Sequence, residues 1–422
     1  MSDIKDIYVS IREQVFDALD AAAIDSLSKE ELTTQLTEGV NILIEQSEYV
    51  LPHVVKVGMV SSFVDELTGL GPLQRLMEDD EIADIMINGP DNVFIEKNGK
   101  VSKSDVRFLD EAQLISIAKR IASRVGRRVD ESEPLCDARL MDGSRVNIVI
   151  PPVAIDGTSM SIRKFKKQTI TLHDLVGFGA LSMEMAQVLT IAARCRLNIL
   201  ISGGTGSGKT TMLNALSAFI SDSERIVTIE DAAELQILQP HVVRLETKNA
   251  GLEGNGAISA RELVINALRM RPDRIIVGEC RGGEAFEMLQ AMNTGHDGSM
   301  STLHANTPRD AVARVESMVM MGTATLPLEA IRRTIVSSVD LIVQIRRLHD
   351  GSRKVMSIAE VIGLEGSSVV LEEIFTFEAG YSEDSNKVVG EFVTPGLMKR
   401  SVLFEKARFF GVTDILEGIF SQ

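Results

Sequence analysis

The sequence has few of the residues on which several common kinds of protein depend. It contains three cysteines, Cys136, Cys195 and Cys280, which lie far apart and form no CxxC pair. They predict neither a disulfide framework nor a zinc cluster, and free thiols fit a reducing compartment. Aromatic residues make up 4% of the chain and tryptophan is absent, which argues against base stacking or an aromatic cage as the basis of function.

Long apolar runs are missing as well. No run in the sequence approaches the roughly 18–20 apolar residues that a bilayer-spanning helix needs. The amino-terminal stretch MSDIKDIYVSIREQ has acidic residues early and no apolar core, so it does not predict a secretory signal peptide. We expect a cytoplasmic protein that associates with a membrane only through a partner.

The net charge of −16 at pH 7 disfavours a general nucleic-acid binder, because neutralising phosphates drives such binding. Basic residues nevertheless gather in one part of the chain. The members of this basic cluster are Arg120, Arg124, Arg127, Arg128, Arg139, Arg145, Arg163, Lys164, Lys166 and Lys167. A local basic cluster in an acidic protein fits a specific anion, with a solvated surface as the alternative.

A chain of 422 residues is too long for one ordinary core. Residues 1–55 predict a helical extension, because apolar residues recur there at helical spacing. Residues 56–165 mix strand-like segments, Asn-Gly turns and one amphipathic helix, which predicts a smaller α/β domain. Residues 166–422 alternate apolar strands with helices, which predicts a parallel sheet covered on both faces, followed by a tail of short strands and a final helix.

The most specific motif is the run GGTGSGKTT, which matches GxxxxGK[ST] between a strand-like and a helix-like segment. Glycines let the backbone N–H groups of such a loop approach a phosphate, Lys209 can reach the β- and γ-oxygens, and the Thr210 hydroxyl can ligate Mg²⁺. We therefore expect ATP and Mg²⁺ to bind here. The predicted nucleotide-binding residues are Gly203, Gly204, Thr205, Gly206, Ser207, Gly208, Lys209, Thr210 and Thr211.

Two acidic motifs follow at the ends of apolar, strand-like segments. Glu279 ends RIIVGE, and Glu230 and Asp231 end TIED. Parallel α/β sheets place their sites at the carboxyl ends of strands. We expect Glu279 to polarise the attacking water or hold the magnesium shell, and the adjacent acids Glu230 and Asp231 can orient water and metal. The alternative for both is an acid that favours the start of the next helix.

Histidines and arginines complete the candidate set. His296 and His304 flank a strand-like segment, where an imidazole can report the γ-phosphate state or hold the catalytic acid, a purely structural role being the alternative. Arg139, Arg145 and Arg163 lie in the smaller domain. An arginine delivered by another domain or subunit supplies positive charge to a transferring phosphoryl group and couples hydrolysis to domain closure. The alternative is a surface salt bridge for each.

Together these motifs resemble the ATPases of type II and type IV secretion and of type IV pili. Four segments stand in that family's order: GGTGSGKTT, TIEDAAEL, RMRPDRIIVGECRGGEA and GHDGSMSTLHANTP. From about Phe63 onward the chain is most similar to the CpaF-type assembly ATPases of tight-adherence (Flp) pili, through LGPLQRLMEDDEIADIMINGPDNVFIEKNGK, CDARLMDGSRVNIVIPP and SIRKF.

The resemblance implies a RecA-like P-loop domain at the carboxyl end and a smaller PAS-like domain before it. It also implies a homohexameric ring at the cytoplasmic face of an inner-membrane pilus or secretion platform. By the same match, the residues expected to act on the nucleotide are Lys209, Thr210, Glu279, Glu230, His304, Arg139 and Arg145. Family members with a tetracysteine zinc module have no counterpart in this sequence, which disfavours those branches and any metal other than Mg²⁺.

The resemblance predicts an ATP-hydrolysing motor for pilus assembly or protein secretion. A conjugative or type IV secretion ATPase is the nearest alternative. A RecA-like DNA motor and a nucleotide-controlled switch that hydrolyses little are further ones. The DNA motor is disfavoured because this acidic, Trp-free chain shows no basic, aromatic loops, and no nucleic-acid partner is expected.

Overall fold

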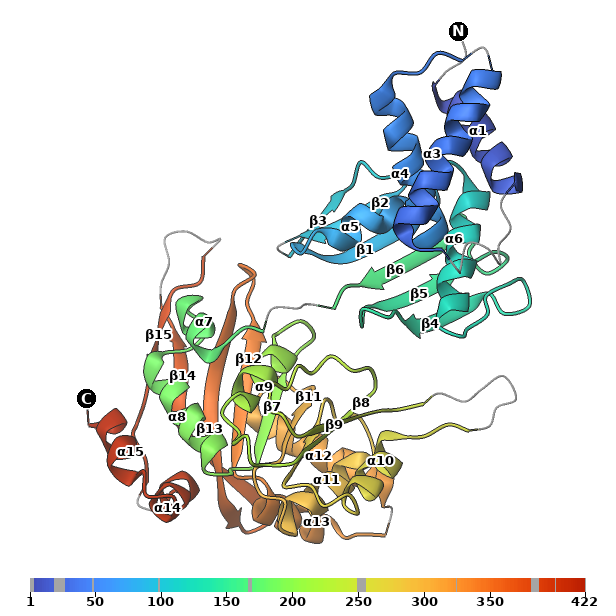
Figure 1. Ribbon diagram of the computed structural model, residues 1–422. Coiled ribbons are helices and arrows are strands. Elements are labelled where there is room, and N and C mark those ends of the chain that lie inside the picture. Colours follow the sequence, from blue (N-terminus) through green and yellow to red (C-terminus); the bar gives the residue numbers. More distant parts are fainter. Residues whose placement is uncertain are drawn as a thin grey trace. The chain divides into compact units, whose positions relative to one another are not determined.

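The computed structural model describes residues 4–18, 27–47, 49–97, 99–165, 169–248, 256–323, 325–380, 387–398 and 400–421 (Figure 1). The chain forms two compact units, Met1–Lys167 and Gln168–Gln422. Both units combine helices with one sheet, so the expected mixed α/β class is confirmed.

The first unit begins with helices α1 (Ile4–Ala18), α3 (Lys29–Gln46) and α4 (His53–Thr68). Ser28 starts α3 with a capping box, in which its side chain accepts from the Glu31 N–H and Glu31 bonds back to the Ser28 N–H. The three helices bury a common apolar core that includes Ile11, Leu32 and Phe63. Apolar residues at helical spacing therefore fold as the pattern predicts.

An antiparallel sheet follows, in the order β3-β2-β1-β6-β5-β4. Helix α6 (Glu111–Arg124) contributes Leu114, Ile117 and Ile121 to the core that this sheet shares. The short elements η1 (Gly71–Leu73) and α5 (Gln74–Glu78) precede the first strand. The strands are β1 (Ile82–Asn88), β2 (Val93–Lys97), β3 (Lys100–Lys103), β4 (Leu135–Arg139), β5 (Arg145–Val149) and β6 (Ser159–Arg163).

The second unit is built on a nine-stranded sheet in the order β15-β14-β13-β12-β7-β11-β10-β8-β9. All pairs from β12 to β9 are parallel. These strands are β7 (Ile199–Gly203), β8 (Ile226–Glu230), β9 (Val242–Glu246), β10 (Arg274–Val277), β11 (Met300–Leu303) and β12 (Leu341–Arg347). They coincide with the apolar segments that the sequence marks as buried strands.

The remaining strands correct one prediction. β13 (Arg353–Glu365), β14 (Ser368–Ala379) and β15 (Gly390–Val393) extend the sheet by antiparallel pairing, and the first two are long rather than short. The turns before and after β13 contain Gly351 at φ 84° and Gly366 at φ 59°. Turns this tight cannot make the crossover that a parallel strand needs, so the chain folds back on itself. The sheet is therefore mixed.

Helices cover both faces of this sheet (Figure 1). One face packs against α7 (Leu172–Gly177), α8 (Met183–Arg194), α9 (Lys209–Ser217), α14 (Val402–Phe409) and α15 (Thr413–Phe420). The other face packs against α10 (Ala260–Ala267), α11 (Glu284–Asn293), α12 (Pro308–Gly322) and α13 (Leu328–Ser338). Strands that are apolar on both sides, as in β7, need both layers.

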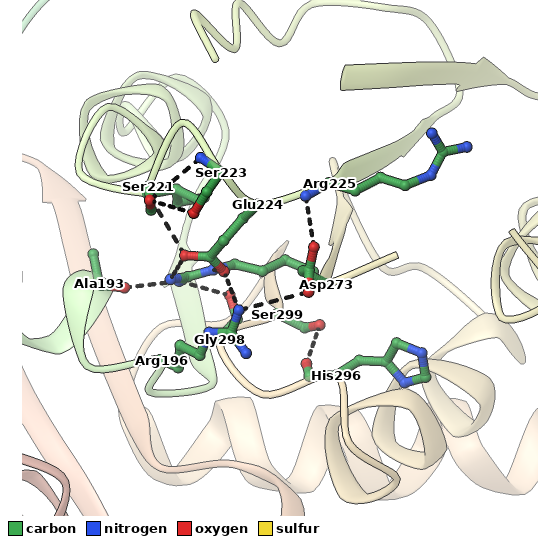
Figure 2. Close-up of polar contacts among 12 residues, drawn as sticks. Ala193, Arg196, Ser221, Ser223, Glu224, Arg225, Asp273, His296, Gly298 and Ser299 are labelled. Atoms are coloured by element: carbon green, nitrogen blue, oxygen red, sulfur yellow. Dashed lines mark hydrogen bonds and ion pairs between the residues drawn. The ribbon is translucent and has the colours of Figure 1, made fainter. Parts of the chain in front are cut away.

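A buried ion pair anchors the start of strand β10. The Arg274 side chain is fully buried, and it donates to the Glu224 carboxylate at 2.7 and 2.9 Å and to the Ala193 carbonyl at 2.7 Å. Figure 2 shows these contacts, with Arg196 ion-paired to the same carboxylate. The cluster thus ties three segments together at the amino end of β10, opposite the end that leads to Glu279.

None of the helices in the described part of the chain is both long and apolar enough to cross a membrane.

Breaking the buried pair is expected to destabilise the second unit strongly. The change Glu224→Ala leaves the Arg274 guanidinium buried without its counter-charge, which costs about 3–5 kcal/mol of unfolding free energy. The matched control is Glu329→Ala, which breaks the exposed Glu329–Arg333 pair of α13 and costs about 0–1 kcal/mol. Urea unfolding followed by circular dichroism compares the two, and equal small losses would contradict the anchoring role.

Candidate nucleotide-binding site

The glycine-rich loop lies where β7 ends and α9 begins. Gly206 has φ 69° and Gly208 has φ 100°, a left-handed conformation that glycine adopts without strain. A β-carbon on Gly203 would stand 2.4 Å from the carbonyl oxygen of Ile345 on the neighbouring strand β12. Glycine is therefore required at these three positions by the backbone itself.

Lys209 closes over this loop. Its side chain is buried, and Nζ donates to the carbonyl oxygens of Gly203 and Gly204, each at 3.1 Å. Burial lowers the pKa of Lys209. The N–H groups in the first turn of α9 have no partner inside the helix, and the helix dipole adds positive potential there. The loop thus offers a glycine cradle, free donors and a cation, which fits the phosphates of a nucleotide.

Glu279 lies just past the end of β10 and meets this cation. Its Oε1 is 4.0 Å from Lys209 Nζ and 2.7 Å from Nε2 of His304. Its Oε2 accepts from Arg281 Nε at 2.6 Å, and Arg281 also forms an ion pair with it through Nη2. The carboxylate is held by three cationic or donor groups beside the loop, which is the place expected for an acid that orients water.

His304 follows β11 and completes the group. Burial and the neighbouring Lys209 ammonium lower the pKa of His304, and the Glu279 carboxylate opposes this shift. His296, by contrast, precedes β11, and its carbonyl accepts from the Ser299 hydroxyl at 2.7 Å. Figure 2 shows His296 joined through its carbonyl to Ser299. The two histidines lie at opposite ends of one strand, and only His304 reaches the loop.

Glu230, the last residue of β8, is buried, and its role in the structure is local. Its Oε2 accepts from the N–H groups of Glu234 at 2.6 Å and Leu235 at 2.8 Å, so it shapes its own loop. Burial raises the pKa of Glu230. A β-carbon on Gly278 would stand 3.0 Å from its Cγ, so the Glu230 side chain packs beside the turn that carries Glu279.

Arg281 is not among the residues predicted from the sequence, and the structure brings it into the site. Arg281 Nη1 lies 3.2 Å from Asp231 Oδ2, so this one side chain joins Asp231 to Glu279. Asp231 is thus linked to Glu279 more directly than Glu230 is. The signal was present in the segment ECRGGEA, where a basic residue stands two positions after the acid.

The loop also fits Mg²⁺. Among the described residues, no group of three or more His, Cys, Asp or Glu side chains could hold a metal ion. Mg²⁺ beside phosphates usually takes only one or two protein oxygens, the rest coming from phosphate and water. Half-buried Thr210, in the first turn of α9, and Glu279 are the candidate donors.

Arg139 and Arg145 lie in the first unit, on β4 and β5. They face each other in register, and Arg145 faces Arg163 of β6 in the same way. Residues directly opposite in a sheet point to the same side, so the three guanidiniums form a row. Arg145 contacts Asp137 at 3.2 Å and Arg163 contacts Asp84 at 3.2 Å. We call these three residues the arginine row.

The comparison with protein families identifies the chain. The model of the Type II/IV secretion system protein family matches residues 66–377, which is more than half of the 422 residues. The chain belongs to this family. The resemblance seen in the four sequence motifs is therefore confirmed at the level of the family.

Curated relatives agree with this membership. A putative conjugal transfer protein of Mycobacterium tuberculosis is 38% identical over 326 residues, covering 76% of this chain and 92% of that protein. The type IV secretion system protein VirB11 of Bartonella henselae is 35% identical over 331 residues, covering 69% and 92%. The conjugal transfer protein TrbB of Rhizobium radiobacter is 34% identical over 294 residues, covering 69% and 86%.

Solved structures show the fold of this family member. The Legionella pneumophila ATPase DotB matches with a TM-score of 0.50 and 21% identity, over 68% of this chain and 79% of that chain. The pilus retraction motor PilT with bound ADP matches with a TM-score of 0.50 and 19% identity, over 82% and 88%. The chain thus shares its mixed α/β fold with these two structures.

The lowered pKa of His304 predicts a pH dependence of stability. Because the folded state disfavours the protonated imidazole, His304 contributes stability fully above its ordinary pKa of about 6.5 and loses it as pH falls below that value. His304→Gln keeps a donor and cannot titrate. The difference in unfolding free energy between wild type and His304→Gln, measured by urea unfolding, should be constant above that pH. Below it, the wild type should lose stability relative to the variant. A shift in favour of the wild type in acid would show that Glu279 dominates instead.

Proposed function

We propose that this family member is an ATP-hydrolysing motor that powers pilus assembly or protein secretion. It would work as a homohexameric ring in the cytoplasm, peripheral to the inner membrane through a platform protein, and its closest kind would be the CpaF-type tight-adherence ATPase. The observation that carries the proposal is the contact of Lys209, Glu279 and His304 at the glycine-rich loop. The order of the four sequence motifs supports the same reading.

In this proposal the loop binds the phosphates of ATP and Glu279 handles the water. Lys209 leaves the Gly203 and Gly204 carbonyls for the β- and γ-phosphate oxygens. Glu279, steadied by His304 and Arg281, orients a water molecule and takes a proton as the water oxygen attacks the γ-phosphorus, and ADP leaves. Bound Mg²⁺, held through Thr210, would neutralise charge on the phosphates. Glu230 assists by fixing the loop beside Gly278.

In this proposal the arginine row couples ATP hydrolysis to movement of the units. Its arginines stand directly opposite one another, so an anion that reaches the row meets several guanidiniums at one place, in exchange for the Asp137 and Asp84 contacts of Arg145 and Arg163. We propose that Arg139 and Arg145, from a PAS-like domain of the same or a neighbouring subunit, reach the ATP phosphates when the units close. Hydrolysis would then require closure, and phosphate release would reverse it.

A conjugative or type IV secretion ATPase is the second candidate. It is favoured by the conjugal transfer and VirB11 relatives, which are 34–38% identical to this chain. A RecA-like DNA motor is disfavoured by the net charge of −16, and we propose no nucleic-acid partner. Deleting the gene and scoring pilus formation, protein export and DNA transfer separately decides between the first two candidates.

Replacing Glu279 tests the chemical step. Glu279→Gln removes the base but keeps the size and one acceptor oxygen, so turnover of ATP should fall by about 10²–10⁴-fold while ATP binding persists. Lys209→Ala should instead lose ATP binding. The control Glu329→Gln changes an exposed glutamate of the same unit and should leave both unchanged. A purified wild-type ring without turnover, or a Glu279→Gln variant with full turnover, would reject the motor.

Replacing Arg139 tests the arginine row. Arg139→Ala should leave ATP binding nearly intact and slow turnover by roughly 10³-fold or more, the scale of an arginine that stabilises phosphoryl transfer. Arg128→Ala removes an exposed arginine of the same basic cluster and serves as the control. Turnover equal to that of the control would leave Arg139 with no role in hydrolysis.

A further inference from the structure

The hairpin between β12 and β13 carries two arginines that sequence reasoning did not single out. Arg347 ends β12 and Arg353 begins β13, and the two face each other in register. Both are exposed, and within the described part of the chain neither forms a salt bridge. Like charges opposite each other in a hairpin are destabilising. Two guanidiniums at one spot are stabilised when a hydrogen-bond acceptor or an anion lies close by.

The turn of this hairpin is tightly fixed. The Asp350 carboxylate accepts from the Ser352 N–H at 2.9 Å and from the Ser352 hydroxyl at 2.6 Å. It also accepts from the N–H of Val388, just before β15, at 2.9 Å. These hydrogen bonds lower the pKa of Asp350 to about 2. The two arginines therefore flank a turn that three hydrogen bonds to the Asp350 carboxylate hold in place.

Both arginines lie beside the glycine-rich loop. Arg353 Nε donates to the carbonyl oxygen of Gly206 at 2.9 Å. A β-carbon on Gly206 would lie 3.8 Å from Arg347 Nη1, so the second guanidinium lies beside the same residue. The sheet also places the hairpin next to the loop, because Ile345 of β12 pairs with Gly203 of β7.

Holding the Gly206 carbonyl constrains the donors of the loop. In a trans peptide the C=O and the following N–H point in opposite directions, so fixing one fixes the other. Lys209 occupies the carbonyls of Gly203 and Gly204 and must leave them to reach a phosphate. Arg353 has no such second task at its Nε, and it can keep the Gly206 peptide in place while nucleotide is bound.

We propose that Arg353 is a positioning residue for nucleotide binding: from the β12–β13 hairpin it fixes the Gly206 carbonyl, so that the loop N–H groups stay turned toward the phosphates that ATP and ADP share. The inference rests on the proposed ATPase function. The β12–β13 hairpin would then be part of the nucleotide pocket. It would increase the affinity for the phosphate chain and take no part in the chemical step.

Titration of the full chain tests this inference. Wild type, Arg353→Ala, Arg353→Lys and Arg346→Ala are titrated with ADP and with a non-hydrolysable ATP analogue. Arg346, also on the hairpin, is exposed, and no contact joins it to the loop, so it is the matched control. Arg353→Ala should raise Kd for both nucleotides by about tenfold, equal to ~1.4 kcal/mol for one charge-assisted hydrogen bond.

Further readouts separate positioning from general structure. Arg353→Ala should raise the KM for ATP with little change in kcat, because the lost interaction serves ground and transition states alike. Arg353→Lys keeps a cationic donor and should recover most of the affinity. The thermal midpoint of all variants should match the wild type.

Several results would overturn the inference while leaving the proposed function intact. They are an unchanged Kd in Arg353→Ala, an equal loss in Arg346→Ala, a loss confined to the ATP analogue, or a fall in kcat at constant KM. A wild-type chain that binds neither nucleotide would overturn the proposed function itself, and this inference with it.

Discussion

The parallel pairing of three buried strands determines where the candidate site of this protein lies. Strands β7, β11 and β10 are neighbours in the sheet, and their shared direction brings their carboxyl ends to one edge. That edge receives the glycine-rich loop from β7, Glu279 from β10 and His304 from β11. Because the strands are buried on both faces, a slip of one residue would turn every side chain of a strand toward the opposite layer of helices and disturb the packing of both. The buried Arg274–Glu224 pair secures the opposite end of β10.

The charges at this edge are balanced against one another. Glu279 is shared by Lys209, His304 and Arg281, and Lys209 divides its ammonium between the loop carbonyls and this carboxylate. In the proposed function, an arriving phosphate chain would offer Lys209 a stronger partner, and its binding would change the charges around Glu279. A small movement of the Lys209 side chain would in this way ready the Glu279 carboxylate for its proposed role with water. The proposed closure of the arginine row would add positive charge only when the units meet.

The buried strands and the glycine-rich loop could be predicted from the sequence, because local patterns of residues determine them. Apolar runs of five or so residues mark β7, β8 and β10, and the glycines at 206 and 208 stand where the loop turns left-handed. What the sequence could not show depends on three-dimensional packing. The tail strands are long and antiparallel because tight turns precede and follow β13, and His296 is separated from His304 by the length of β11. Arg281 and Arg353 carry no motif, because their roles come from the neighbours that folding gives them.

The proposed function requires that a triphosphate sits in the glycine-rich loop with Glu279 beside it. The most direct measurement is a structure of the full chain with a non-hydrolysable ATP analogue and Mg²⁺. We expect the β-phosphate among the N–H groups of residues 206–211, with Lys209 Nζ moved from the Gly203 and Gly204 carbonyls to phosphate oxygens. A nucleotide lodged elsewhere, with Lys209 still bonded to those carbonyls, would contradict it.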